Sequence, residues 1–138
     1  MAWSVRMSPA AREDINAMFH AAFETAIEII AKGQPQPFGV LLDNDGRILI
    51  QHVNPPPGWN SADLVRHMAE SIYQRADTLQ AALLVQHTGD NAFPTMQGYG
   101  DHRDATGFSF FITWRSGYGG PATIADISVE PANAQLFR

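Results

Sequence analysis

The sequence predicts a single α+β domain, in which a mainly antiparallel five-stranded sheet is packed by two helices in the order α-β-β-α-β-β-β. Two long segments carry apolar residues at the three- and four-residue spacing of a helix face. Short apolar runs between residues such as Gly, Pro, Asn and Asp are typical of strands and their turns. The 138 residues suffice for one compact domain and are too few for two cores of ordinary size.

The first helix is expected over residues 9–32. Ser8 is placed to cap it and Pro9 to occupy its first position, because Ser accepts from the free N–H groups there and Pro has none to satisfy. Gly33 is placed to end the helix. Its apolar face consists of Ile15, Met18, Phe19, Ala22, Phe23, Ala26, Ile27 and Ile30.

A hairpin is expected next, with residues 38–42 and 47–53 as its two arms. Residues 43–46 have the sequence Asp-Asn-Asp-Gly, whose members tolerate the positive φ angles of tight turns. Both arms carry apolar residues on both faces, so we expect both to lie inside a covered sheet. The proline-rich residues 55–58 then end the second arm.

A second helix follows, with Asn60 or Ser61 as its cap and Asp63 in the first turn, where the free backbone N–H groups stabilise a carboxylate. Its expected buried stripe consists of Val65, Met68, Ile72, Ala76 and Leu79.

Three more strands are expected, at residues 82–85, 108–115 and 123–130, the last after a glycine-rich turn at 117–120. Between residues 88 and 107 the chain has neither helical nor strand periodicity. We interpret this segment as a loop that is unusually long for a compact domain.

Nine basic and fourteen acidic residues give a net charge of −5. This balance argues against an extended electrostatic grip on phosphate backbones or anionic lipid, so we expect neither nucleic acid nor a membrane as partner. Apolar runs are shorter than the roughly 20 residues of a membrane helix. Without cysteine there is no disulfide, thiol nucleophile or zinc thiolate site, and the cytoplasm is the default location. Lys32 is the only lysine among the basic residues, a bias typical of GC-rich bacterial coding.

The opening Pro-Phe-Gly-Val-Leu-Leu of residues 37–42, followed by Asp-Gly at residues 45–46 and by His-Met-Ala-Glu at residues 67–70, resembles zinc-dependent cytidine deaminases. The resemblance covers about the first half of the chain. It implies a zinc ion held by a histidine and a Pro-Cys-x-x-Cys motif, with a glutamate as acid and base. This chain has no cysteine, and His67 and Glu70 are one residue too far apart for the His-Ala-Glu pattern. We therefore expect no deaminase activity.

The order of helices and strands also resembles roadblock and longin domains, a profilin-like group that works by binding partners. The Phe-Gly-Val strand and the Asp-Gly hairpin after a long helix are similar to those of small bacterial α+β proteins. The resemblance to roadblock and longin domains implies a binding role. The resemblance to small bacterial α+β proteins implies no activity, because a shared order of elements does not define a function.

Catalytic and metal-binding patterns are weak. His87, Asp101, His102 and Asp104 carry nitrogen and oxygen ligands, but their spacing fits no metal motif, so we expect neither a metal nor another cofactor. The chain has no Gly-x-Ser-x-Gly elbow, and its glycine-rich segments do not lead into helices or carry a P-loop lysine.

Aromatic side chains occur where burial in the core is not assured. Phe111 and Arg115 share the outward face of their strand, and other aromatic residues fall in expected loops, where they either bury themselves or form an interface. Aromatic residues and arginine are enriched at interface centres, and carboxylates complement a basic partner. The predicted binding residues are Trp59, Phe93, Tyr99, Asp101, Asp104, Phe111, Arg115 and Tyr118.

We therefore expect a non-enzymatic protein-binding domain, such as an inhibitor or immunity-type bacterial protein, acting through acidic and aromatic loops or a sheet surface. Homodimerisation through the sheet is compatible with this expectation. The alternative is a small-molecule sensor or enzyme with a pocket under the 88–107 loop, where His87 or His102 acts as acid or base with Asp101 or Asp104. A structural role in a larger assembly is the third interpretation.

Overall fold

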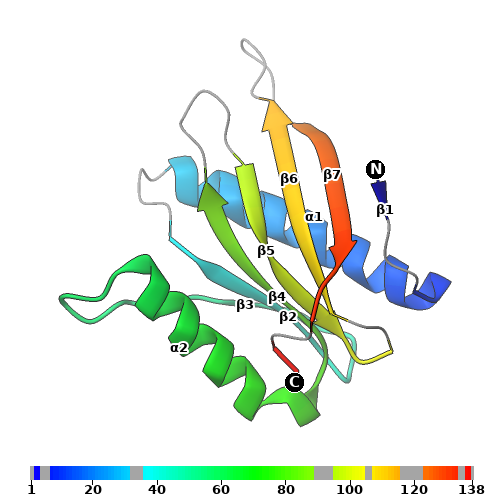
Figure 1. Cartoon of the computed structure of the whole chain (residues 1–138), viewed down its shortest axis with the longest axis horizontal. Coiled ribbons are helices and arrows are strands. Elements are labelled where there is room, and N and C mark those ends of the chain that lie inside the picture. Colours follow the sequence, from blue (N-terminus) through cyan, green and yellow to red (C-terminus); the bar gives the residue numbers. More distant parts are fainter. Residues whose placement is uncertain are drawn as a thin grey trace.

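The computed structural model describes residues 2–3, 7–31, 36–88, 95–104, 107–115, 123–133 and 136–137. In these ranges the chain forms two α-helices and one sheet in the order β1-β7-β6-β5-β4-β2-β3 (Figure 1). The elements are β1 (Ala2–Trp3), α1 (Pro9–Ala31), β2 (Phe38–Asp43), β3 (Ile48–Gln51), α2 (Ser61–Gln74), the 3-10 turn η1 (Ala76–Thr78), β4 (Leu79–Thr88), β5 (Thr95–His102), β6 (Phe108–Arg115) and β7 (Thr123–Pro131). Strands β2 to β7 are antiparallel to their neighbours, and the short β1 pairs with β7 in parallel. The α+β class is confirmed.

The two helices lie on opposite faces of the sheet and cover unequal parts of it (Figure 1). Helix α1 crosses one face and packs against inward side chains of β2, β4, β5, β6 and β7 in the larger core cluster. Helix α2 contributes Leu64, Met68 and Ile72 to a second cluster on the other face, together with side chains of β2 and β4 and with Leu136. The described helices therefore leave the β5–β7 part of that second face without a helical cover.

The expected helix starts are confirmed by their caps. The Ser8 hydroxyl accepts the backbone N–H of Ala11 at 3.1 Å. Asn60 is the cap of α2, because its side chain accepts the backbone N–H of Asp63 at 2.8 Å while the Asp63 carboxylate accepts the backbone N–H of Asn60 at 3.1 Å. This reciprocal arrangement satisfies two N–H groups that the helix leaves unpaired.

The end of α2 differs from the expected one. The helix stops at Gln74, so Ala76 lies in η1 and Leu79 begins β4 instead of extending the buried helical stripe. Beyond this end, the guanidinium of Arg103 donates to the backbone carbonyl oxygens of Ala76 and Leu79. Leu79 still joins the α2 core cluster, but it does so from the strand.

The sheet contains one antiparallel strand more than expected. Strand β5 lies within residues 88–107, which the sequence pattern assigns to a loop. Two of its inward positions are glycines, and Gly98 and Gly100 lie opposite Phe110 and Phe108 in the β5–β6 ladder. A Cβ on Gly100 would overlap the Phe108 ring, and one on Gly98 would overlap the carbonyl of Leu84. Glycine at these positions therefore leaves room for the rings and the backbone. Because glycine stands where a strand normally carries inward apolar residues, the sequence of β5 does not show the apolar alternation of a strand.

The hairpin forms as expected, but only one arm is covered. Gly46 has a φ of +85°, and the Asp43 carboxylate accepts the backbone N–H of Arg47 at 2.9 Å and its guanidinium N–H at 3.0 Å. These bonds to the ionised form, chiefly the one from the Arg47 backbone, hold the pKa of Asp43 below its ordinary value. Strand β2 is buried, whereas β3 is the last strand in the sheet order and leaves Ile48 and Leu49 36% and 43% exposed. The expectation of burial is therefore wrong for the second arm.

None of the described helices combines the length and apolar character needed to cross a bilayer.

Candidate functional site

The candidate site is the uncovered part of the sheet. We call it the open face and define it by the outward side chains of Gln86, Gln97, Tyr99, Ser109, Phe111, Ser128 and Glu130. Two rows cross the strands here. Tyr99 lies opposite Ser109, which lies opposite Glu130, and Gln97 lies opposite Phe111, which lies opposite Ser128. Because residues opposite each other point to the same side of a sheet, the ladder itself brings these side chains together.

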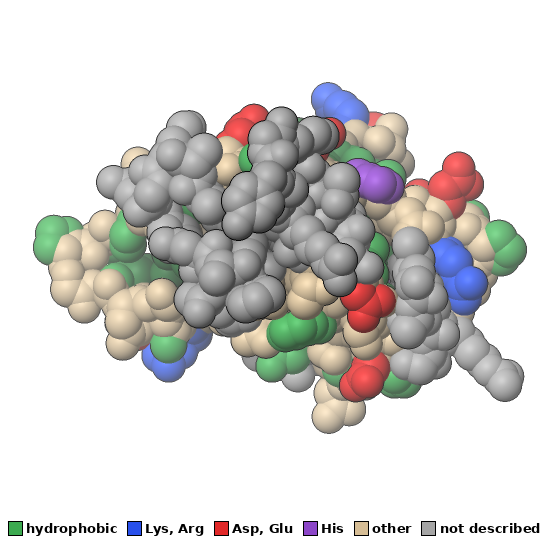
Figure 2. All heavy atoms as spheres, turned by 90° about the horizontal axis from the view of Figure 1, so that it is seen from above, with side chains coloured by type: hydrophobic (Ala, Val, Ile, Leu, Met, Phe, Trp, Pro, Cys, Tyr) green, Lys and Arg blue, Asp and Glu red, His purple; other side chains and the backbone are tan. Residues whose placement is uncertain are grey.

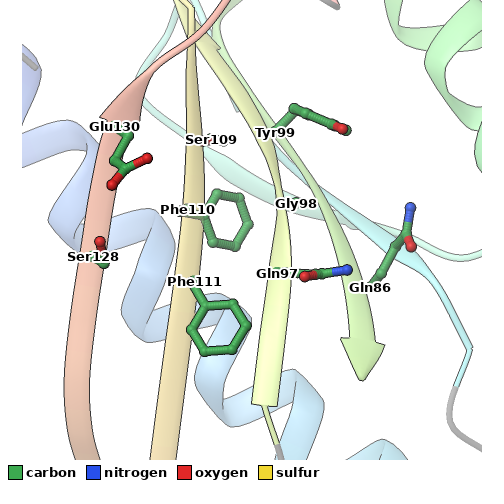
Figure 3. Close-up of a pocket in the computed structure, with 9 residues that line it drawn as sticks. All are labelled: Gln86, Gln97, Gly98, Tyr99, Ser109, Phe110, Phe111, Ser128 and Glu130. Atoms are coloured by element: carbon green, nitrogen blue, oxygen red, sulfur yellow. The ribbon is translucent and has the colours of Figure 1, made fainter. Parts of the chain in front are cut away.

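The open face is hollowed. A depression of about 500 Å³ lies over it, and Gly98 and Phe110 contribute to its lining. Phe111 is 43% exposed and its ring extends over the gap between β6 and β5, while Tyr99 is 41% exposed and its ring turns toward β4 (Figure 3). Glu130 stands on β7, across β6 from the two rings (Figure 3). The depression therefore has aromatic, neutral polar and carboxylate walls.

Glu130 is the charged residue of the open face. It lies in the row of Tyr99, and Asp126 lies on the same side of β7 two outward positions further, opposite Thr113. No lysine or arginine lines the depression; the one lysine or arginine in the described parts of β5 to β7 is Arg115 at the end of β6, whose side chain lies outside the described residues. Figure 2 shows the molecule from above, where acidic and basic side chains both lie among hydrophobic ones.

Asp101 points to the same side as Tyr99, but it is buried. Its Oδ2 accepts the backbone N–H groups of Leu136 at 2.7 Å and Phe137 at 2.8 Å, and only 3% of the residue is exposed. Asp101 therefore fastens the C-terminal segment at one end of the open face. Its Oδ1 is buried and accepts no hydrogen bond in the described part of the chain.

His102 points to the opposite side of the sheet, toward α1. Its Nε2 lies 2.9 Å from Asp14 Oδ2, and its Nδ1 accepts the backbone N–H of Asp104 at 3.0 Å. Since Nδ1 is the acceptor, Nε2 carries the hydrogen and donates it to Asp14. The Asp104 carboxylate accepts from Gln80 at 3.2 Å. Thus Asp101 and His102, one of the pairs in the alternative prediction, lie on opposite faces of the sheet.

The structure holds no cluster of three or more potential metal ligands among the residues it describes. The side chain of His87, which the metal interpretation also used, lies outside the described residues.

Trp59 lies apart from the open face, at the start of α2. It is 39% exposed, and its ring centroid is 5.4 Å from that of His67 in an edge-on arrangement. Asp63, Arg66 and Glu70 complete a shallow hollow around this pair. Of the eight predicted binding residues, the structure brings Tyr99 and Phe111 together and places Trp59, Asp101 and Asp104 elsewhere.

The remaining predicted binding residues cannot be placed in the same way. Phe93 and Tyr118 lie outside the described residues, and so does the side chain of Arg115, whose backbone belongs to β6.

The polar members of the open face are missing from the sequence prediction. Gln86, Gln97, Ser109, Ser128 and Glu130 acquire a common site only through the register of four strands. A period-two pattern was present in the sequence, since Gln97, Tyr99 and Asp101 alternate with glycine, but that pattern identifies a strand only if glycine counts as an inward residue.

Comparisons with known protein families, with curated proteins and with solved structures find no match to this chain.

Proposed function

We propose that this protein is a non-enzymatic protein-binding domain that holds its partner on the open face. The observation that carries the proposal is the pair of aromatic side chains, Tyr99 and Phe111, exposed on the part of the sheet that the described helices leave uncovered. Aromatic side chains bury about 150–250 Å² each when they are covered, so they are frequent anchors of protein interfaces.

The charge of this face supports a partner of defined chemistry. Glu130 and Asp126 are both exposed, and the protein as a whole has a net charge of −5. Opposite charge speeds the encounter of two proteins and excludes wrong partners, while the buried aromatic contacts set most of the affinity. The expected partner therefore presents a basic surface with an apolar centre. An inhibitor or immunity-type role in a bacterial cytoplasm agrees with this chemistry, with the cysteine-free sequence and with the bias toward arginine.

The alternative of a small-molecule enzyme or sensor has less support. Its acid–base groups were His87 or His102 with Asp101 or Asp104; of these, Asp101 and His102 point to opposite faces, where each is already hydrogen-bonded. The depression on the open face has a volume within the range of roughly 300–1,000 Å³ that ligand pockets occupy. A bound small molecule is therefore an outcome that the experiment has to distinguish.

Site-specific photo-crosslinking tests the proposal. A photoreactive phenylalanine analogue is introduced at Phe111 and, as a matched control, at Tyr73 on α2, which is also 43% exposed. In cells of the native host, we expect a discrete protein adduct from position 111 that is absent from position 73. The Tyr99→Asp substitution should abolish this adduct. It removes the second aromatic anchor and places a charged side chain where an apolar contact is needed.

The opposite results contradict the proposal. Identical adducts from both positions would show unspecific contact. No protein adduct at position 111, together with a small molecule that copurifies and is seen by native mass spectrometry, would favour the sensor or enzyme. A crosslinked dimer of this chain would identify the partner as a second copy.

A further inference from the structure

We propose that the depression on the open face is a socket for an arginine side chain of the partner protein. This inference rests on the proposed function and specifies the chemistry of its central contact. Phe111 and Glu130 both line the socket, from the neighbouring strands β6 and β7, and the Phe111 ring is turned toward β5, away from Glu130 (Figure 3).

The spacing of these groups follows from the β6–β7 ladder. Phe111 lies opposite Ser128, and Glu130 lies two residues further along β7, opposite Ser109. Diagonal neighbours of this kind stand about 7–8 Å apart on one face of a sheet. Because the Phe111 ring is turned toward β5, a group that covers the ring and also reaches the Glu130 carboxylate has to be long, with an apolar stem and a polar end. Ser109 is small, so its side chain leaves the intervening space open.

The charges around the socket favour a cation. Glu130 lines it, Asp126 stands two outward positions from Glu130 along β7, and no lysine or arginine is among the residues that line it. An anionic ligand such as a phosphate would be repelled. A wholly apolar group would remove Glu130, Ser128 and Gln97 from water without giving them a partner, which is costly for polar groups and most costly for a carboxylate.

Arginine fits the remaining requirements better than lysine. Its planar guanidinium is more weakly hydrated than an ammonium group and presents five N–H donors in a fixed geometry. Two of these donors match the Glu130 carboxylate in a bidentate pair, and the Ser128 hydroxyl lies on the same strand for another. The methylene groups of the arginine cover the Phe111 ring and leave the guanidinium at the acidic wall.

Two tripeptides test the inference, acetyl-Leu-Arg-Leu-amide and the same peptide with citrulline, the uncharged isostere of arginine. Binding is followed by the backbone amide shifts of the ¹⁵N-labelled full chain. We expect the arginine peptide to shift the amides of Gln97, Phe111 and Glu130, and citrulline to weaken binding about 10-fold, in keeping with the loss of a charge-assisted bidentate pair.

Two variants locate the charge that matters. Glu130→Gln should weaken binding of the arginine peptide about 10-fold and remove the preference for arginine over citrulline. Asp126→Asn is the matched control, because it removes a carboxylate from the same face of the same strand outside the lining of the depression, and it should weaken binding less than about 3-fold. The amide spectrum of each variant also reports whether it is folded.

The results separate this inference from the proposed function. Equal affinity of both peptides on the open face overturns the arginine socket, whereas the docking face stands. An equal loss of affinity in the two variants also overturns it, because the attraction would then come from the general field of the face. If neither peptide shifts the open-face amides, the socket is refuted, while crosslinking at position 111 decides independently whether proteins dock there.

Discussion

Gly100→Ala tests whether glycine in β5 is required by the aromatic packing beneath it. The added Cβ would lie about 2.5 Å from Phe108 Cε2 and 2.7 Å from Leu83 Cδ2. Ordinary carbon–carbon contact is roughly 3.5–4.0 Å, so the ring and the leucine methyl would both have to withdraw by about 1 Å. Phe108 is 1% exposed, and its ring centroid is 6.5 Å from those of Phe19 and Phe110, so its neighbours oppose this movement.

The expected cost follows from this confinement. Overpacking a close-packed core costs about 1–3 kcal/mol, and we expect Gly100→Ala to lie at the upper end, with a decrease of about 2–3 kcal/mol in the free energy of unfolding. For a chain of this size, the corresponding decrease in Tm is roughly 5–10 °C. Urea unfolding followed by tryptophan fluorescence measures the first quantity, and a thermal scan measures the second.

A double-mutant cycle identifies the mechanism. Phe108→Leu removes part of the ring that the new methyl group meets, so the double variant should be more stable than the sum of the two single effects by at least about 1 kcal/mol. Gln97→Ala, at an outward position of the same strand, is the control and should change stability by less than about 0.5 kcal/mol. The packing argument would be refuted if Gly100→Ala had the same free energy of unfolding as the wild type, or if the effects of the two substitutions were strictly additive.

Three further predictions concern single interactions. Asn60→Ala should lower the free energy of unfolding by about 1 kcal/mol in urea titrations, because the α2 cap is lost, and an unchanged value would contradict the cap's role. Asp101→Ala should cost about 2–3 kcal/mol and accelerate hydrogen exchange at the amides of residues 136–137, whereas unchanged exchange there would show that the carboxylate does not fasten this segment. The ionised Asp43 carboxylate accepts from Arg47, which lowers its folded-state pKa, so its stabilising contribution is present above the ordinary pKa of aspartate and disappears as the pH falls through the lowered value. The stability difference between wild type and Asp43→Asn should therefore shrink toward zero on acidification, and a constant difference from neutral to acidic pH would argue against this origin.

Local signals made the helix starts and the hairpin predictable. Ser8 and Asn60 cap helices by bonding to N–H groups within the next few residues, and Gly46 supplies the positive φ of the turn. Such interactions involve neighbours in the chain, so residue type and spacing are sufficient to infer them. Residue type also led to Tyr99 and Phe111 as predicted binding residues, and the structure exposes both on the open face, but the prediction assigned Tyr99 to a loop.

The sequence by itself determined the α+β class, the two capped helices, the tight turn and most of the apolar strands, because each depends on contacts within a few residues. The tertiary structure decided that β5 is a strand, that β3 lies at the edge and that α2 ends before Leu79. These outcomes depend on partners distant in the chain, such as the Phe108 ring over Gly100 and the Arg103 guanidinium at the end of η1. The open face also depends on residues that are distant in the chain. Neither Glu130 nor Phe111 indicates a site by its own sequence context, and only the register of β6 and β7 places them on neighbouring strands of one face.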